Sequence, residues 1–400
     1  MPSEKPRVLL FSQRNIFKGV LFRCALYEFE DIISQIDSVD LLAPRVDVSS
    51  RQYKLARRLA YRAPMVLSAG GERVGIKSDY DLFVAVCGFP TDLLMLKNIG
   101  NWRDRCKTAV CLIDELWIKQ FGTYRHFLDA LKHFDVIVLY YSQTVKPLSE
   151  RIERKCVFVP PGVDAIRFSP HPETPQRGID VCSIGRRSEV THQSLLKMAD
   201  KEGIFYLHDT LSASQAIDAS EHRALTANIA KRSRYFIVNP GLIDQPERRG
   251  NQIEIGNRYF EGAAAGAILL GERPDNDAFS RLFDWPDALI HLPYNSSNVD
   301  EIIHQLDGEP ARQEAIRQRN VVNVLRRHDW VYRWESVLQS IDLKPLPQLL
   351  QRKEHLKHLA DAIPGSDFVA PSVTQSHSTD SGGQQLTENG TERGHSLSQC

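Results

Sequence analysis

The sequence lacks an excess of charge of either sign. Its 400 residues include 50 lysines and arginines and 50 aspartates and glutamates, so the formal net charge is zero. A chain without a global field does not attract nucleic acid or an anionic membrane, and such a partner would need a local patch. Long apolar runs are also missing, since no stretch approaches the roughly twenty apolar residues that cross a bilayer, and the N-terminus shows no export signal. We therefore expect a cytoplasmic protein with no nucleic-acid partner.

Cysteine pairs and the short motifs of several enzyme classes are absent as well. The seven cysteines form no Cys-x-x-Cys pair, and several lie in strand-like runs such as 109–113, so we expect buried free thiols without a metal or disulfide framework. The sequence contains no Gly-x-x-x-x-Gly-Lys loop, no Gly-x-Gly-x-x-Gly after the first expected strand, no Gly-x-Ser-x-Gly elbow and no His-Glu-x-x-His helix. These absences argue against P-loop, dinucleotide-dependent, serine hydrolase and zinc protease chemistry.

One local basic segment stands out, between positions 51 and 62. Its basic residues are Arg51, Lys54, Arg57, Arg58 and Arg62, and they surround Tyr53, Ala56, Leu59 and Ala60 at helical spacing. A solvated helix face is the favoured interpretation, and a weak peripheral membrane contact is the alternative.

Short β-rich runs alternate with longer helical patterns along most of the chain. The expected strands are 7–11, 39–43, 81–87, 108–113, 135–140, 156–159, 180–184, 204–208, 235–238, 267–270 and 288–292. This alternation predicts an α/β fold with parallel sheets covered on both faces. The Pro160-Pro161-Gly162 break divides the strands into two sets, which indicates two Rossmann-like domains facing across a cleft.

The expected domain limits follow from this break and from the composition. We predict a first Rossmann-like domain at 1–160, a second at 161–335, and helices at 336–364, including 348–362. Residues 365–400 are rich in Ser, Thr, Gln and Gly with few large apolar side chains, so they are predicted to be a disordered tail.

The most informative motif runs from position 253 to 271. Arg258-Tyr-Phe-Glu261 leads into a small-residue stretch that ends at Gly266, and a short apolar run follows. Small residues let a helix approach a sheet closely, and Gly266 fits a left-handed C-terminal cap. Arg258 and Glu261 share one helix face, so within an otherwise apolar unit we expect them to point at a polar group. An exposed ion pair is the alternative.

A second motif, the linker Val159-Pro-Pro-Gly-Val-Asp-Ala-Ile-Arg-Phe-Ser-Pro170, gives the first one a context. Together they resemble the GT-B glycosyltransferases of the retaining "glycosyl transferases group 1" type, in particular the divergent CgeB-like branch. The resemblance implies two doubly wound, Rossmann-like domains, with the acceptor domain at 1–160 and the nucleotide-sugar domain at 161–335. It also implies that the helices of 336–364 return over the first domain and that Glu261 holds the ribose of a nucleotide-sugar donor. A second Glu usually stands eight residues earlier, but that position is Ile253, and Glu254 is displaced by one.

The expected donor side lies at strand ends of the second domain. Gly185 permits close backbone approach, and Arg186 or Arg187 can pair with a diphosphate. The resemblance implies a Lys seven residues after this Gly, where the chain has His192. A surface turn with solvated arginines is the alternative.

Further donor contacts are expected from Asn239, Asn251 and Gln252. The last two precede a helix predicted over 254–265, whose first-turn amides can hold phosphates. Each of these side chains may equally be a turn or helix-capping residue.

The acceptor side is expected in the first domain. Asp114 and Glu115 follow the 108–113 strand directly, where a carboxylate can deprotonate an acceptor hydroxyl, and Trp117 can stack on a sugar ring. A helix N-cap is the alternative role for Asp114. The loop that ends at Gly19 is expected to line the same cleft.

These features predict a metal-independent transfer of a sugar from a nucleoside-diphosphate donor to a hydroxyl acceptor, without a further cofactor. The alternative is a non-catalytic protein of the same shape that binds a nucleotide sugar or a glycan. The sugar, the base, the acceptor, the stereochemical course and the oligomeric state are left open by the sequence.

Overall fold

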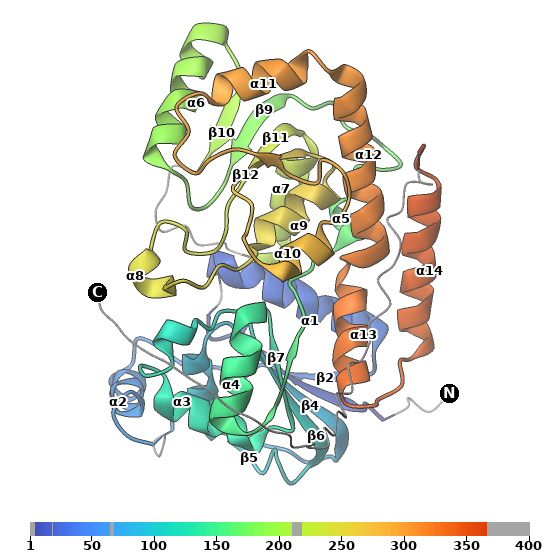
Figure 1. Ribbon diagram of the computed structural model, residues 1–400. Coiled ribbons are helices and arrows are strands. Elements are labelled where there is room, and N and C mark those ends of the chain that lie inside the picture. Colours follow the sequence, from blue (N-terminus) through green and yellow to red (C-terminus); the bar gives the residue numbers. More distant parts are fainter. Residues whose placement is uncertain (1–4, 18, 65–67, 210–217, 366–400) are drawn as a thin grey trace, which may run out of the picture. The chain divides into compact units, whose positions relative to one another are not determined.

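The computed structural model describes residues 5–17, 19–64, 68–209 and 218–365 of the chain (Figure 1). From position 366 onward, the predicted tail lies outside these residues. Among the described residues, two parallel sheets form the framework, one in each half of the chain. The predicted α/β fold with two parallel sheets is therefore confirmed.

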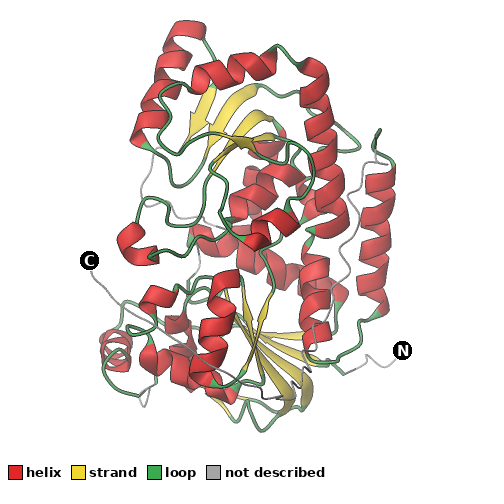
Figure 2. Ribbon diagram, viewed as in Figure 1, coloured by secondary structure: helices red, strands yellow, loops and turns green. Residues whose placement is uncertain are grey.

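The first sheet has six strands in the order β2-β1-β4-β6-β7-β8, and all of its pairings are parallel. Its strands are β1 (Val8–Phe11), β2 (Val39–Leu42), β4 (Tyr80–Cys87), β6 (Cys106–Ile113), β7 (Val136–Leu139) and β8 (Lys155–Phe158). Val8 and Leu10 pack into one apolar cluster and Leu9 and Phe11 into another, because side chains alternate between the faces of a strand. Figure 2 shows helices on either side of these strands.

Helices of the first half connect these strands. The α-helices are α1 (Cys24–Ile36), α2 (Arg51–Ala60), α3 (Arg125–Ala130) and α4 (Val145–Ile152). Short 3-10 helices are η1 (Leu21–Arg23), η2 (Pro90–Asn98), η3 (Ile118–Gln120), η4 (Leu131–His133) and η5 (Ser142–Thr144). Two short strands, β3 (Val74–Gly75) and β5 (Ile99–Gly100), form a separate parallel pair that we did not predict, because two residues are too few for a pattern.

The second sheet has five strands in the order β10-β9-β11-β12-β13, again with parallel pairings. They are β9 (Ile179–Ser183), β10 (Tyr206–His208), β11 (Ser233–Val238), β12 (Ile268–Gly271) and β13 (Ile290–His291). The helices of this half are α5 (Ala165–Phe168), α6 (Glu189–Glu202), α7 (Ala219–Lys231), α8 (Pro246–Arg249), α9 (Asn257–Ala264), α10 (Asp277–Leu282), α11 (Val299–Asp307) and α12 (Pro310–Arg327). None of the described helices is both long enough and apolar enough to span a lipid bilayer.

The linker pairs with the segment that enters the last two helices, α13 (Trp330–Ser340) and α14 (Pro347–Asp361). The amide of Val163 donates to the carbonyl of His328, and the amide of Trp330 donates back to the carbonyl of Val163, both at 3.2 Å. A Cβ on Gly162 would lie 2.7 Å from the Trp330 ring, so this linker position has no space for a side chain. The two crossings between the halves are thus held side by side.

Helix α13 is joined to α1 and to its C-cap by buried hydrogen bonds. The Trp334 indole donates to the Asp37 carboxylate at 2.8 Å, and the Trp330 indole donates to Glu28 at 2.9 Å. The described residues all fall within one compact unit. The domain limits at 160, 335 and 364 therefore stay predictions.

Helix α9 begins later than the sequence pattern predicts. We expected a helix from position 254, whereas the structure places 252–256 in an extended loop and starts the helix at Asn257, after Gly256 at the N-cap. The reason is that the Glu254 carboxylate leaves its own chain segment and accepts backbone hydrogen bonds from Ser142 and Gln143, both at 3.0 Å. Gly266 has a φ of +63°, which agrees with the predicted left-handed cap.

Candidate active site

The carboxyl ends of the strands lead into the residues that the sequence singled out. Gly185 follows β9, Asn239 follows β11, and Asp114 follows β6. Ligands of parallel α/β sheets bind at this edge, because the loops there converge. The two edges meet in this chain, since a Cβ on Gly241 would lie 3.4 Å from the ring of Trp117.

Glu261 is the centre of a buried ionic cluster. Its side chain lies on α9, the residue is 1% exposed, and its two carboxylate oxygens accept from the guanidinium groups of Arg223 and Arg258. Burial alone opposes ionisation, but the charges and hydrogen bonds of Arg258 and Arg223 lower the pKa of Glu261 to about 2. The predicted Arg258–Glu261 pair therefore does point at a polar partner, and that partner is Arg223.

Arg223 extends this cluster to the first half of the chain. From α7 it donates to both carboxylate oxygens of Glu28 on α1, at 3.0 and 3.2 Å. Glu28 also accepts from the Trp330 indole and from the backbone amide of Asp164 in the linker. The sequence analysis missed Arg223 and Glu28, because their partners are far away along the chain.

The Gly185 loop places both candidate diphosphate ligands in ion pairs. Gly185 has a φ of +96° and its amide donates to Asp209 at 3.0 Å. Arg187 pairs with the same Asp209 at 3.1 Å, and Arg186 pairs with Asp244 at 2.9 Å. Both arginines are half-buried or exposed, so these pairs can exchange for another anion.

His192 lies near the start of α6, close to this loop. Its Nδ1 is 3.0 Å from the hydroxyl of Tyr206, and its ring packs edge-on against His208. Burial, together with the charges of Arg187 and His208, lowers the pKa of His192. His192 therefore contributes a hydrogen-bonding group and less positive charge than a lysine would at this position.

The second-tier donor residues take different positions. Asn251 is exposed, and Asn239 keeps a buried Oδ1 that no described protein group bonds. Gln252 is buried and joins the two halves, because its Oε1 accepts from the amide of Ile118 and its Nε2 donates to Thr144. Gln252 is therefore engaged in a contact with the first half rather than left open for a ligand.

Asp114 is partly buried at the end of β6. Its amide donates to the carbonyl of Cys87. Burial, followed by the charge of Glu115, raises the pKa of Asp114 to about 8, although Arg23 opposes the shift. No helix begins at this position, so the alternative role as an N-cap does not apply. Asp114 carries a proton at neutral pH.

Trp117 is turned into the protein, and this changes the role expected for it. Its indole donates to Glu115 at 2.8 Å, its ring packs at 4.7 Å from the ring of Tyr141, and it is 0% exposed. A fully buried ring offers no face to a sugar. Trp117 instead packs the end of β6 against Gly241 of the second half.

The loop between β1 and α1 reaches the same region. Gly19 is buried with a φ of +83°, and Arg23, four residues later, forms a buried ion pair with Asp92 at 2.7 Å. Asp92 also accepts from the amide of Gly88, which directly follows Cys87 at the end of β4. These contacts fix the loop beside the end of β4. The charges of Arg23 and Asp92 also act on the pKa of Asp114.

Tyr141, directly after the predicted 135–140 run, is the residue around which both halves meet. Burial raises its pKa well above the ordinary value, Glu115, Asp114 and Glu254 raise it further, and Arg186 lowers it. A Cβ on Gly241 of the second half would lie 3.5 Å from the Tyr141 hydroxyl, so this side chain lies where the two halves meet. Its position after a strand end is the signal that sequence reasoning overlooked.

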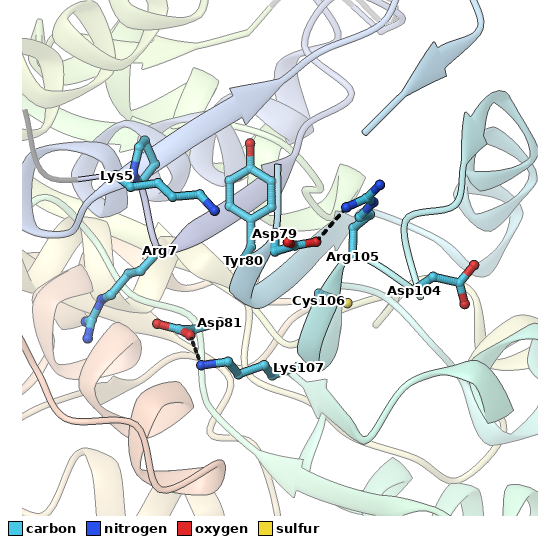
Figure 3. Close-up of a pocket in the computed structure, with 10 residues that line it drawn as sticks. Lys5, Arg7, Asp79, Tyr80, Asp81, Asp104, Arg105, Cys106 and Lys107 are labelled. Carbon is cyan, nitrogen blue, oxygen red and sulfur yellow. Dashed lines mark hydrogen bonds and ion pairs between the residues drawn. The ribbon is translucent and has the colours of Figure 1, made fainter. Parts of the chain in front are cut away.

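One cavity among the described residues opens at the opposite edge of the first sheet. It has a volume of about 410 Å³ and lies at the amino ends of β1, β4 and β6, where Asp79 pairs with Arg105 and Asp81 pairs with Lys107 (Figure 3). Ligands of such sheets bind at the carboxyl ends of the strands, so this cavity carries no argument for the active site.

An Asp-x-Asp triplet can hold a metal ion, so the two triplets of the sequence bear on the expectation of a metal-independent reaction. They are Asp79-Tyr80-Asp81, beside the cavity just described, and Asp275-Asn276-Asp277, at the start of α10. In the part of the chain that the structure describes, no group of His, Cys, Asp and Glu side chains is arranged to hold a metal ion.

Comparisons with known proteins show what part of this chain is similar to. Residues 200–339, which include Arg223, Asn239, Gln252, Arg258 and Glu261, match the family model described as "Glycosyl transferase-like". The Gly185 loop lies outside the matched residues. No curated protein matches the chain.

Solved structures share the fold at low sequence identity. An alpha-glucosyltransferase in complex with UDP-glucose and DNA containing an abasic site has a TM-score of 0.51 and 11% identity, with 84% of this chain and 98% of that chain covered. A UDP-forming alpha,alpha-trehalose-phosphate synthase from Burkholderia xenovorans has a TM-score of 0.52 and 10% identity, with coverage of 84% and 99%. The corresponding protein from Burkholderia vietnamiensis has a TM-score of 0.50 and 10% identity, with coverage of 87% and 99%.

The family-model match agrees with the resemblance that the linker and the Glu261 motif indicate, and the solved structures confirm the two-sheet architecture. The CgeB-like branch stays a prediction. Residues 200–339 match the glycosyl transferase-like family model, and the fold of the chain is that of the GT-B glycosyltransferases.

Proposed function

We propose that the protein transfers a sugar from a nucleoside-diphosphate donor to a hydroxyl acceptor at the edge where the two sheets meet. The bond between the anomeric carbon and the diphosphate breaks, and its electron pair leaves with the diphosphate. The acceptor oxygen forms the new bond to the anomeric carbon, and its proton passes to a carboxylate. The observation that carries the proposal is that the carboxyl ends of the two sheets meet, since a Cβ on Gly241 of the second half would lie 3.4 Å from the Trp117 ring and 3.5 Å from the Tyr141 hydroxyl of the first half.

On the donor side, Arg186 and Arg187 neutralise the diphosphate. Each now pairs with a carboxylate, Asp244 or Asp209. An incoming diphosphate offers more charge and more acceptor oxygens than either aspartate, so it replaces them at little cost. These cations and the loop amides then stabilise the leaving group without a metal ion.

The ribose is assigned to Glu261. Its carboxylate stays ionised, and Arg258, whose side chain is 30% exposed, is the outer of its two partners. Binding requires Arg258 to move aside while Arg223 continues to hold the carboxylate. On the acceptor side, Asp114 or Glu115 takes the proton, and Asp114 does so only after it ionises.

Calorimetric titration with UDP-, GDP-, TDP- and ADP-glucose tests the donor site. We expect one nucleotide class to bind the wild type, and Arg186→Ala to weaken that binding about tenfold or more, because it removes a charge-assisted contact. Arg281→Ala, at an exposed position on α10, is the matched control and should bind like the wild type. A folded wild type that binds none of the four donors contradicts the proposal.

Asp114→Asn separates an enzyme from a protein that only binds its ligand. If transfer takes place, this change should lower turnover about 100-fold or more while donor affinity stays the same. Unchanged turnover excludes Asp114 as the base. Donor binding without turnover of any hydroxyl acceptor by the wild type supports the non-catalytic alternative.

A further inference from the structure

Helix α2 presents arginine and leucine side chains on one outward face. Tyr53, Ala56 and Ala60 are buried and hold the helix to the protein. On the other side, Leu55 is 54% exposed and Leu59 is 38% exposed. The sequence analysis grouped Leu59 with the inward residues, but the helix turns it toward solvent.

The charges of this face are all positive. Residues 51–62 contain no Asp or Glu, and their basic side chains are those of Arg51, Lys54, Arg57, Arg58 and Arg62. Among the residues that the structure describes, none of them closes a salt bridge, whereas arginines elsewhere in the same half, such as Arg23 and Arg103, do so. In a chain of zero net charge, this face is a local positive patch without salt bridges, although the charge of Lys54 acts on nearby Asp47.

Nearby carboxylates are already engaged. Asp47 accepts hydrogen bonds from the amide and the hydroxyl of Ser49, and Glu72 accepts from the amide of Arg45. These contacts keep the carboxylates with their own loops. The positive charge of α2 is therefore available to an external anion.

Leu55 lies one helical turn from both Arg51 and Arg58, so the apolar and the basic side chains share one ridge. An anionic bilayer matches this mixture, because its phosphates accept from arginine while leucine enters the boundary of the acyl chains. A nucleic acid would satisfy the charges but would leave the leucines against a polar surface. We propose that the exposed face of α2 docks the protein on an anionic membrane surface.

Co-sedimentation of the full chain with lipid vesicles tests this proposal. We expect binding to vesicles that contain phosphatidylglycerol and not to vesicles of phosphatidylcholine alone, and we expect added salt to weaken it. Arg51→Gln/Arg58→Gln/Arg62→Gln should weaken binding about 100-fold, and Leu55→Gln/Leu59→Gln should also weaken it, about tenfold. The altered side chains are exposed, so a thermal melt should show an unchanged fold.

Helix α6 offers the matched control, because it exposes Leu196 and two lysines but also carries acidic residues. Leu196→Gln/Lys197→Gln/Lys201→Gln should bind vesicles like the wild type. No binding of the wild type to anionic vesicles overturns the proposal, as does binding that both α2 variants retain. Binding of duplex DNA that depends on the arginines and not on the leucines overturns it in favour of nucleic acid.

Discussion

The raised pKa of Asp114 affects both its proposed role as a base and the stability of the fold. Burial, and then Glu115, raise its pKa from 3.8 to about 8, so the folded protein holds a proton that the unfolded chain has lost at neutral pH. A base in this state becomes more effective as pH rises toward 8. The same shift makes the ionised carboxyl unfavourable in the fold.

Replacing Asp114 by Asn should therefore stabilise the protein in a pH-dependent manner. Between about pH 4 and pH 8, the native state binds more protons than the unfolded state, so the wild type loses stability as pH rises. Asparagine cannot ionise, and the free energy of unfolding of Asp114→Asn should exceed that of the wild type by on the order of 2 kcal/mol near pH 8. Near pH 4 the two proteins should be equally stable. Urea unfolding at both pH values measures the difference.

The control for this experiment is Asp47→Asn. Asp47 is exposed, and hydrogen bonds from Ser49 lower its pKa, so its removal should not stabilise the protein at high pH. An Asp114→Asn variant with the same advantage at both pH values would show that packing, and not ionisation, is responsible.

Single residues of the site were predictable when their role is local. Asp114 follows a strand whose pattern is plain, and Glu261 stands in a motif of the family. Arg223 and Tyr141 were not found, because an arginine in a polar helix and a tyrosine after a strand look ordinary until folding brings distant partners to them. The burial of Trp117 against the second half was missed for the same reason.

The close packing of β11 and β12 shows what positions the loops of the second half. Val238 and Gly271 are register partners, and a Cβ on Gly271 would lie 1.7 Å from the carbonyl oxygen of Val238. Each strand is followed at once by a residue at the ligand-binding edge, Asn239 or Glu272. A glycine at this position thus sets the spacing of two site loops.

Gly271→Ala should destabilise the protein by about 3 kcal/mol, because neither strand backbone can move without breaking its pairing. Gly178→Ala is the matched control in the same half, since a Cβ there meets nothing within 4 Å, and its effect should stay within about 0.5 kcal/mol. Denaturant unfolding with unchanged m values measures both. Equal stability of the two variants would mean that β12 tolerates a shift.

Elements with a strong period were predicted well, and short or long-range ones were not. The apolar runs of β4 and β6 predict strands directly, because strands buried on both faces are continuously apolar. Strands as short as β3 and β5 have too few residues to show a periodic pattern of apolar side chains. The start of α9 depends on Glu254, whose carboxylate binds amides of the first half, and no local pattern contains that information.

Polar contacts link the two halves at separated places. In one place, Gln252 and Glu254 of the second half bind Ile118, Thr144, Ser142 and Gln143 of the first half. In another, Glu28 of α1 binds Arg223 of α7, which also binds Glu261 of α9. The residue assigned to the donor is therefore held, through Arg223, by the half that carries the acceptor residues.

Arg223→Met should reveal how far the whole fold depends on this cluster. The change leaves the buried carboxylates of Glu28 and Glu261 facing each other with one cation fewer, and we expect a loss of about 3–5 kcal/mol in the free energy of unfolding. Arg312→Met is the control, because Arg312 pairs with Asp287 and Glu309 in a half-exposed setting, where the loss should be about 1 kcal/mol or less.

A double-mutant cycle with Glu28→Gln distinguishes a coupled cluster from independent contacts. If Glu28 and Arg223 act as a pair, Glu28→Gln should cost about 1–3 kcal/mol less in the Arg223→Met background than in the wild type, because its partner is already gone. Additive losses would mean that the two halves are joined mainly by the Gln252 and Glu254 contacts. In that case Arg223 would still bind Glu261, but it would not couple the donor site to Glu28 of the first half.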